Sequence, residues 1–229
     1  MKRKQIFLFF GTIAALLSAC TTKNTNDISF SELQVPNTND TTNNPLTADN
    51  VSTYSSIYAQ IAADNTSDSV KYALIYLDND TIPELVVYDA GYDTYSLYTI
   101  KDESAFCMLD SFTTVELSYF EQTGIICSFT RWNGGGDEGG YGFSYYQTGS
   151  DKTLTDLSEP ILSDTYNAVY NDNSEFTGEG ITNYYHLGAE IDEASYQTRL
   201  SELGIKQGNG KSCMENVLTK DEFLRDLSQ

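Results

Sequence analysis

The residues of this chain best suited to bind an ion lie in one short acidic segment, Tyr76 to Val87. The segment runs Tyr-Leu-Asp-Asn-Asp-Thr-Ile-Pro-Glu-Leu-Val-Val, so its acidic side chains are separated by small or apolar ones. Ca²⁺ takes about six to eight oxygen ligands, and alternate positions of a curled loop bring several carboxylates to one point. The segment therefore indicates either a calcium loop or an Asp/Asn-rich turn that joins two strands.

Residues 72–87 resemble the strand–calcium-loop–strand motif of FG-GAP and VCBS-type repeats. They also resemble the segment DLDGDGIPELLV of uncharacterised extracellular proteins of Firmicutes. The resemblance implies that Asp78, Asp80 and Glu84 are Ca²⁺ ligands at loop positions three, five and nine.

Two residues of the loop depart from that pattern. Tyr76 stands at position one, where the pattern has a carboxylate, and Thr81 stands at position six, where glycine allows a tight turn. These changes remove one ligand and stiffen the turn. We therefore expect a loop that keeps its geometry but has lost most of its calcium affinity.

A second candidate site is the glycine-rich segment from Arg131 to Tyr141. An aromatic ring flanked by carboxylates can hold a sugar or a cationic ligand. We expect Trp132, Asp137 and Glu138 to contact a glycan or protein ligand. The alternative is a long hairpin loop without a ligand, because loops of this composition are common.

The sequence contains none of the local motifs of serine, zinc or β-lactamase-type hydrolases. His186 is the only histidine, and a lone histidine in an alternating strand is more often structural than catalytic. The 33 acidic residues still allow a glycosidase-like pair of carboxylates. The alternative function is thus a carboxylate-dependent hydrolase of cell-wall or dietary glycan, with no catalytic residue assigned.

The N-terminus has the form of a lipoprotein signal peptide. A basic Lys2-Arg3-Lys4 precedes an apolar run of 12 residues, and Leu17-Ser18-Ala19-Cys20 resembles the lipobox of bacterial lipoproteins. The run is shorter than the ~20 residues that span a bilayer. We expect residues 1–19 to be removed and Cys20 to carry lipid, which predicts an extracytoplasmic protein anchored in the bacterial cell membrane.

The chain is strongly acidic, with a formal net charge of −20. Removal of the signal peptide takes away three basic residues and no acidic one, which gives −23. Such a surface repels phosphate backbones and excludes nucleic acid as a partner.

Residues 20–46 are rich in Thr and Asn and predict a flexible tether, because they cannot bury enough apolar surface to fold. Residues 47–229 predict a single α+β domain, with a helix near Thr47, a central antiparallel sheet and two C-terminal helices. Tyr72 to Leu77 is apolar on both faces and predicts a central strand. The other expected strands are 84–88, 93–100, 105–110, 124–130, 141–147 and 181–187.

Three cysteines remain after Cys20, namely Cys107, Cys127 and Cys213. We favour free thiols in apolar surroundings, with a Cys107–Cys127 disulfide as the alternative. The sequence as a whole favours a lipid-anchored, non-catalytic interaction module, in which either Ca²⁺ braces the 76–84 loop or the loop is a metal-free turn. A purely structural envelope protein would share the same features.

Overall fold

The computed structural model describes residues 48–133, 138–171 and 175–228, with backbone alone for 48–53. All of these residues belong to one compact unit. The predictions for residues 1–47, including lipid attachment at Cys20, lie outside the described residues. No helix in the described part is long and apolar enough to cross a membrane.

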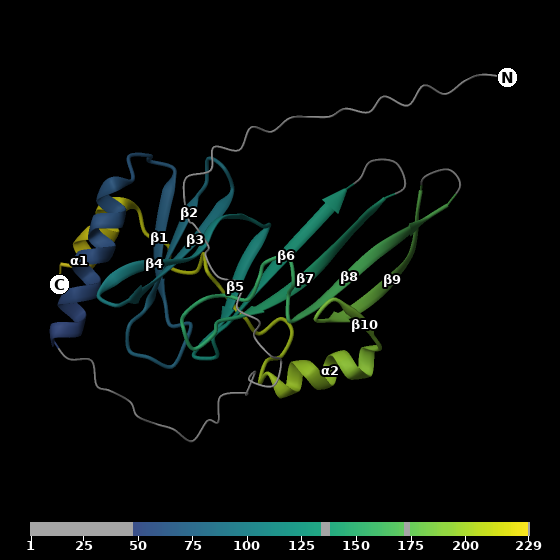
Figure 1. Ribbon diagram of the computed structural model, residues 1–229. Coiled ribbons are helices and arrows are strands. Elements are labelled where there is room, and N and C mark those ends of the chain that lie inside the picture. Colours follow the sequence, from purple (N-terminus) through teal and green to yellow (C-terminus); the bar gives the residue numbers. More distant parts are fainter. Residues whose placement is uncertain (1–47, 134–137, 172–174, 229) are drawn as a thin grey trace, which may run out of the picture. The chain divides into compact units, whose positions relative to one another are not determined.

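The described chain is an α+β fold with three helices, as the sequence predicted, but its eleven strands exceed the seven expected and form two antiparallel sheets instead of one (Figure 1). The first sheet has the order β1-β2-β3-β4, and the second has the order β10-β9-β8-β7-β6-β5-β11. The helices are α1 (Ala48–Asp64), α2 (Glu193–Glu202) and α3 (Lys220–Asp226). The strands are β1 (Val70–Ile75), β2 (Glu84–Asp89), β3 (Thr94–Lys101), β4 (Ser104–Thr113), β5 (Glu116–Phe120), β6 (Ile125–Asn133), β7 (Gly139–Gln147), β8 (Leu162–Tyr170), β9 (Phe176–His186), β10 (Ala189–Ile191) and β11 (Lys211–Ser212).

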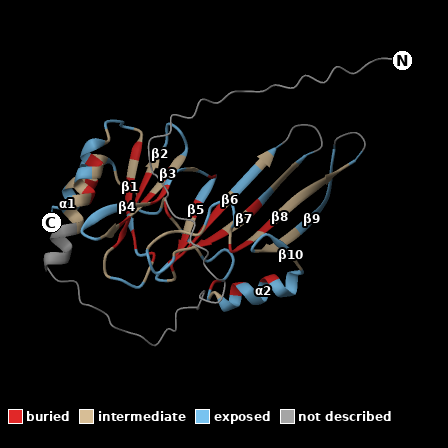
Figure 2. Cartoon of the chain, in the orientation of Figure 1, coloured by how far each residue is buried: buried red, intermediate tan, exposed pale blue. Residues whose placement is uncertain are grey.

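The main core lies between the two sheets. Strand side chains alternate between faces, so Val86 of β2 and Ile126 of β6 join one cluster of buried residues that both sheets share. Their neighbours Leu85 and Ile125 point the other way, into two further clusters on the outer faces. Figure 2 shows this buried interior along the strands of both sheets.

Helices cover the two outer faces. On the first sheet, Phe223 of α3 stacks on Tyr72 of β1 with ring centroids 5.1 Å apart, in a cluster that also contains Tyr58 of α1. On the second sheet, Tyr196 and Leu200 of α2 are buried against β9 and its neighbours. The strands therefore carry apolar residues on both faces.

This layering buries adjacent side chains of one strand and corrects an expectation about position. Tyr145 and Tyr146 are both buried, because one side of β7 faces α2 and the other faces the first sheet. β1 lies at an edge of its sheet and not at the centre. Backbone hydrogen bonds between Tyr72 and Leu218 protect part of that edge.

The second of the two predicted C-terminal helices, α3, begins at a complete capping box. The Thr219 hydroxyl accepts from the Glu222 backbone N–H, and the Glu222 carboxylate accepts from the Thr219 N–H in return.

The three cysteines among the described residues form no disulfide, as favoured. Cys127 and Cys213 are buried in different clusters and Cys107 is half-buried, so Cys107 and Cys127 form no disulfide.

Candidate functional site

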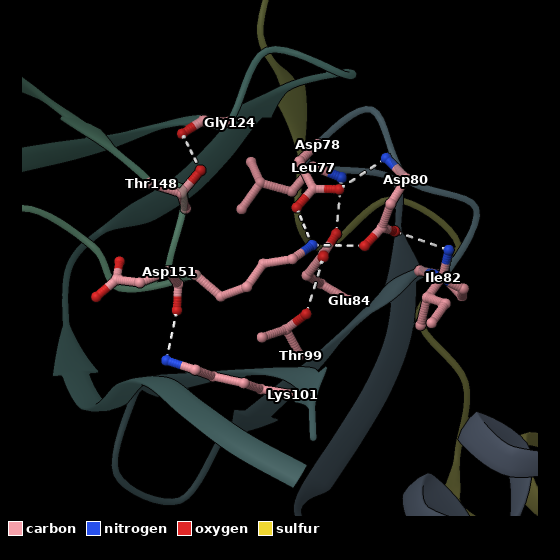
Figure 3. A network of polar contacts seen from close by, with 12 residues as sticks. Leu77, Asp78, Asp80, Ile82, Glu84, Thr99, Lys101, Gly124, Thr148 and Asp151 are labelled. Carbon is pink, nitrogen blue, oxygen red and sulfur yellow. Dashed lines mark hydrogen bonds and ion pairs between the residues drawn. The ribbon is translucent and has the colours of Figure 1, made fainter. Parts of the chain in front are cut away.

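The acidic segment forms the connection between β1 and β2, as its sequence predicted. The Asp78 carboxylate accepts a hydrogen bond from the Asp80 N–H at 3.0 Å, and the Asp80 carboxylate accepts one from the Ile82 N–H at 2.8 Å (Figure 3). These are local side-chain-to-backbone turns of the kind that Asp favours. Thr81 is absent from the residues with positive φ, so the connection folds without the left-handed residue that a glycine would supply.

Glu84 begins β2 and is fully buried. One carboxylate oxygen accepts from the Leu77 N–H at 2.9 Å, and the other accepts from the Thr99 hydroxyl at 3.2 Å. The pKa of Glu84 is raised from 4.5 to about 7, first by burial and then by the charges of Asp78 and Asp80, against the hydrogen bond from Leu77 and the charge of Lys152. Glu84 thus titrates near neutral pH.

Lys152, from the turn that follows β7, reaches across to this loop. Its ammonium pairs with the Asp78 carboxylate and, at 2.5 Å, with the Asp80 carboxylate. The side chain of Lys152 is 21% exposed and that of Asp78 22%. Burial works against the charge of Lys152, but the hydrogen bonds to the two aspartates outweigh it and raise the pKa of Lys152. Figure 3 shows the side chains of Asp78, Asp80 and Glu84 converging on this point.

The loop meets one requirement of a calcium site and fails another. Carboxylate oxygens of Asp78, Asp80 and Glu84 lie within 4.8 Å of one another, a spacing that oxygens at about 2.3–2.6 Å from one ion can have. However, an ammonium already lies between the first two, and both oxygens of Glu84 accept protein hydrogen bonds. The described residues fit an internal ammonium better than Ca²⁺, so calcium binding stays a prediction.

Sequence reasoning missed Lys152 altogether. It lies 74 positions from Asp78, and nothing in the intervening sequence indicates that the two meet. The only local signal is the sequence Asp-Lys-Thr in a polar turn, which is common on protein surfaces.

The second candidate segment is mostly strand, not loop. β6 continues through Asn133 and β7 begins at Gly139, so only the residues between them make the connection. In this register Trp132 lies directly opposite Gly140. A Cβ atom on Gly140 would lie 2.4 Å from the Trp132 ring, so the glycine allows the indole to cover the neighbouring strand.

The extended ends of β6 to β9 line a groove with a volume of about 280 Å³. Tyr141 and Tyr166 stack within it, with ring centroids 4.9 Å apart and planes 18° apart. Tyr141 is 41% exposed and Phe176, at the rim, is 54% exposed. Among the described residues that line the groove, Arg131 is the only charged one. Five aromatic residues line it, namely Trp132, Tyr141, Tyr166, Tyr170 and Phe176.

The three predicted ligand contacts differ in position. Trp132 lines the groove, whereas Glu138 is exposed and is not among the lining residues. Asp137 lies outside the described residues. The sequence analysis missed Tyr166 and Tyr170, because it predicted no strand at 162–170, although aromatic residues spaced four apart in a Tyr- and Asn-rich run were a usable signal.

A second hollow, with a volume of about 530 Å³, lies on the first sheet. Its lining includes two carboxylates, Asp89 at the end of β2 and Asp110 on β4, together with the exposed Tyr92. Asp89 accepts hydrogen bonds from the Ser69 hydroxyl and the Gly91 N–H, both at 2.8 Å, and therefore stabilises the adjacent turn.

Comparisons with protein families, with curated proteins and with solved structures found no match. The protein is therefore characterised by its own fold and sites: an α+β unit of two packed antiparallel sheets, with an aromatic groove on the second sheet and a partly buried acidic cluster at the first.

Proposed function

We propose that this protein is a non-catalytic binding module for glycans, held at the outer face of a bacterial membrane by lipid on Cys20. The aromatic groove on β6 to β9 is the observation that carries the proposal. Binding sites for small ligands combine apolar and aromatic walls with a few polar groups that set orientation. Here the walls are tyrosine, tryptophan and phenylalanine rings, and Arg131 and Asn133 supply the polar groups.

The charge of the chain limits the kind of glycan. A net charge of −20 repels polyanions at long range. Arg131 is a single cation among uncharged lining residues, so it can pair with one acidic group at most. We therefore infer a neutral or weakly acidic sugar whose apolar face packs on the rings of Tyr141 and Trp132.

A glycan array with the full-length chain tests this proposal. Trp132→Ala and Tyr141→Ala should each weaken binding to the bound glycans by about tenfold or more, because stacked rings contribute up to about 1.5 kcal/mol beyond the area that they bury. Tyr92→Ala is the matched control, since Tyr92 is 80% exposed and lies away from the groove.

Four results would contradict the proposal. An array without signal, or a signal that survives both groove substitutions, would place the function elsewhere. Loss of signal with Tyr92→Ala alone would point to the second hollow. Binding to a peptide array that depends on Tyr141 would keep the groove but replace the glycan with a protein ligand.

The alternative, a carboxylate-dependent hydrolase, draws support from the second hollow, where Asp89 and Asp110 share one lining. Glycosidases use two such carboxylates. Release of reducing sugar from cell-wall or dietary glycan, lost in Asp110→Asn but kept in Trp132→Ala, would favour it. The role of Asp89 in the turn favours a structural assignment for that residue.

A further inference from the structure

The carboxylates in the connection between β1 and β2 pair with a cation from the turn after β7, Lys152. We propose that the ammonium of Lys152 replaces Ca²⁺ in this loop, so that the loop is independent of calcium and clamps the second sheet to the first. The proposal does not depend on the glycan groove. It explains why the carboxylates of a calcium-like loop stay close together although the position-one carboxylate is missing.

The first argument is electrostatic. Asp78, Asp80 and Glu84 bring three carboxylates within 4.8 Å, and like charges at that distance repel unless a cation lies among them. Lys152 contacts two of the three directly and lowers the pKa of the third through its charge. A divalent ion at the same place would have to displace the ammonium, because two cations cannot share these oxygens.

The second argument is that the turn around Lys152 is built to hold it. Lys152 has φ of +68°, a left-handed conformation that costs free energy in a residue with a side chain. Its N–H donates to the Gly149 carbonyl at 3.0 Å, and Asp151 accepts from both the N–H and the hydroxyl of Thr153. Lys101 of β3 donates to the Asp151 carbonyl at 2.8 Å, which fixes the turn to the first sheet.

The third argument is position. The backbones of the two sheets meet beside the loop, where Gln122 N–H donates to the Tyr76 carbonyl at 3.0 Å and Gly124 N–H donates to the Leu77 carbonyl at 2.7 Å. The Thr148 N–H then donates to the Gly124 carbonyl at 2.8 Å. Lys152 lies four residues after Thr148 in the same turn. Its ion pairs with Asp78 and Asp80 therefore connect the two sheets through side chains beside these backbone hydrogen bonds.

Calcium titration of the full-length chain tests the proposal. The wild-type chain should show no change in melting temperature with 5 mM CaCl₂. Lys152→Met removes the charge and keeps an apolar stem, so it should melt lower without Ca²⁺ and gain about 3–6 °C at a calcium concentration ten times its Kd. Adding Asp80→Asn should abolish that gain. Lys101→Met, which loses a contact to the same turn without touching the carboxylates, should stay unresponsive to calcium.

Two outcomes would overturn the proposal: a calcium-dependent rise in the wild-type chain that Asp80→Asn removes, or a Lys152→Met chain that folds and does not respond. Lys152→Gln serves as the second variant if Lys152→Met does not fold. A measurement on the wild-type chain needs no variant: the ¹H–¹⁵N signal of the Lys152 ammonium should persist in 5 mM CaCl₂, and its loss would show that calcium displaces it.

Discussion

Glu84 is a carboxylic acid without access to solvent, and its surroundings set its charge state. Tyr58 of α1 lies on one side of Glu84, and its hydroxyl donates to the Pro83 carbonyl at 2.8 Å. The charges of Asp78, Asp80 and Lys152 act on Glu84 from the other side. Burial is the largest influence on its pKa, and the charge of Lys152 acts against it. Because the pKa is raised to about 7, we expect the charge of Glu84 to change near neutral pH.

The stability of the protein should fall as pH rises through the pKa of Glu84. Folding raises this pKa from 4.5 to about 7, so between these values the folded chain holds a proton that the unfolded chain has released. The contribution is complete below about pH 4.5, declines up to about pH 7 and amounts to about 3 kcal/mol. Thermal melts from pH 4.5 to 8 should show it.

Glu84→Gln should flatten much of this decline, because the amide has nothing to ionise. Part will remain, since burial also raises the pKa of Asp164, which accepts from Tyr196 at 2.5 Å. Glu190→Gln, at an exposed position of β10, is the control and should leave the profile unchanged. A Glu84→Gln chain with the wild-type slope would contradict the assignment.

At the scale of elements, α3 depends on the rest of the fold. A helix of seven residues is not stable in isolation. It persists here because Thr219 and Glu222 cap it and because Phe223, 1% exposed, stacks on Tyr72. The helix in turn covers the edge strand β1.

Phe223→Ala should therefore destabilise the protein by about 3 to 5 kcal/mol, through the lost ring and the cavity that it leaves. Urea unfolding followed by circular dichroism would measure it. Arg225→Ala, exposed on the same helix, should change stability by less than about 0.5 kcal/mol. Equal effects of the two substitutions would mean that α3 does not dock on β1.

At the scale of the whole molecule, charge and the predicted anchor act together. The N-terminal sequence predicts a lipid-anchored protein, and anionic headgroups repel an acidic surface. We therefore expect the domain to be held away from the bilayer. The groove on β6 to β9 presents two exposed aromatic rings, Tyr141 and Phe176, for contact with a ligand.

Cys20→Ala should release the protein from the membrane, because the thiol that accepts lipid is gone. In detergent phase separation of bacterial cells, the wild-type chain should enter the detergent phase and the Cys20→Ala chain the aqueous phase. Cys107→Ala, which keeps Cys20, should behave as wild type. A Cys20→Ala chain that stays in the detergent phase would refute lipidation at this residue.

Local signals in the sequence were sufficient for the elements that depend on near neighbours. Tyr54, Tyr58 and Ile61 lie at helical spacing in α1, Thr219 and Glu222 form the capping box that begins α3, and the acidic turn predicted the β1–β2 hairpin. Each of these depends on contacts between residues a few positions apart, so the pattern and its cause lie in the same stretch of chain.

The tertiary structure alone decided how the two candidate sites are built. Trp132 faces Gly140 because β6 and β7 extend further than their residues suggested, and Tyr166 joins them from a strand that carries no clear alternation. The acidic turn was visible in the sequence, but Lys152, which neutralises it, comes from the other sheet. Strand alternation and helix capping depend on residues close together in the sequence. The partner of a partly buried charge depends on how distant strands pack. No pattern in the sequence between Asp78 and Lys152 indicates that packing.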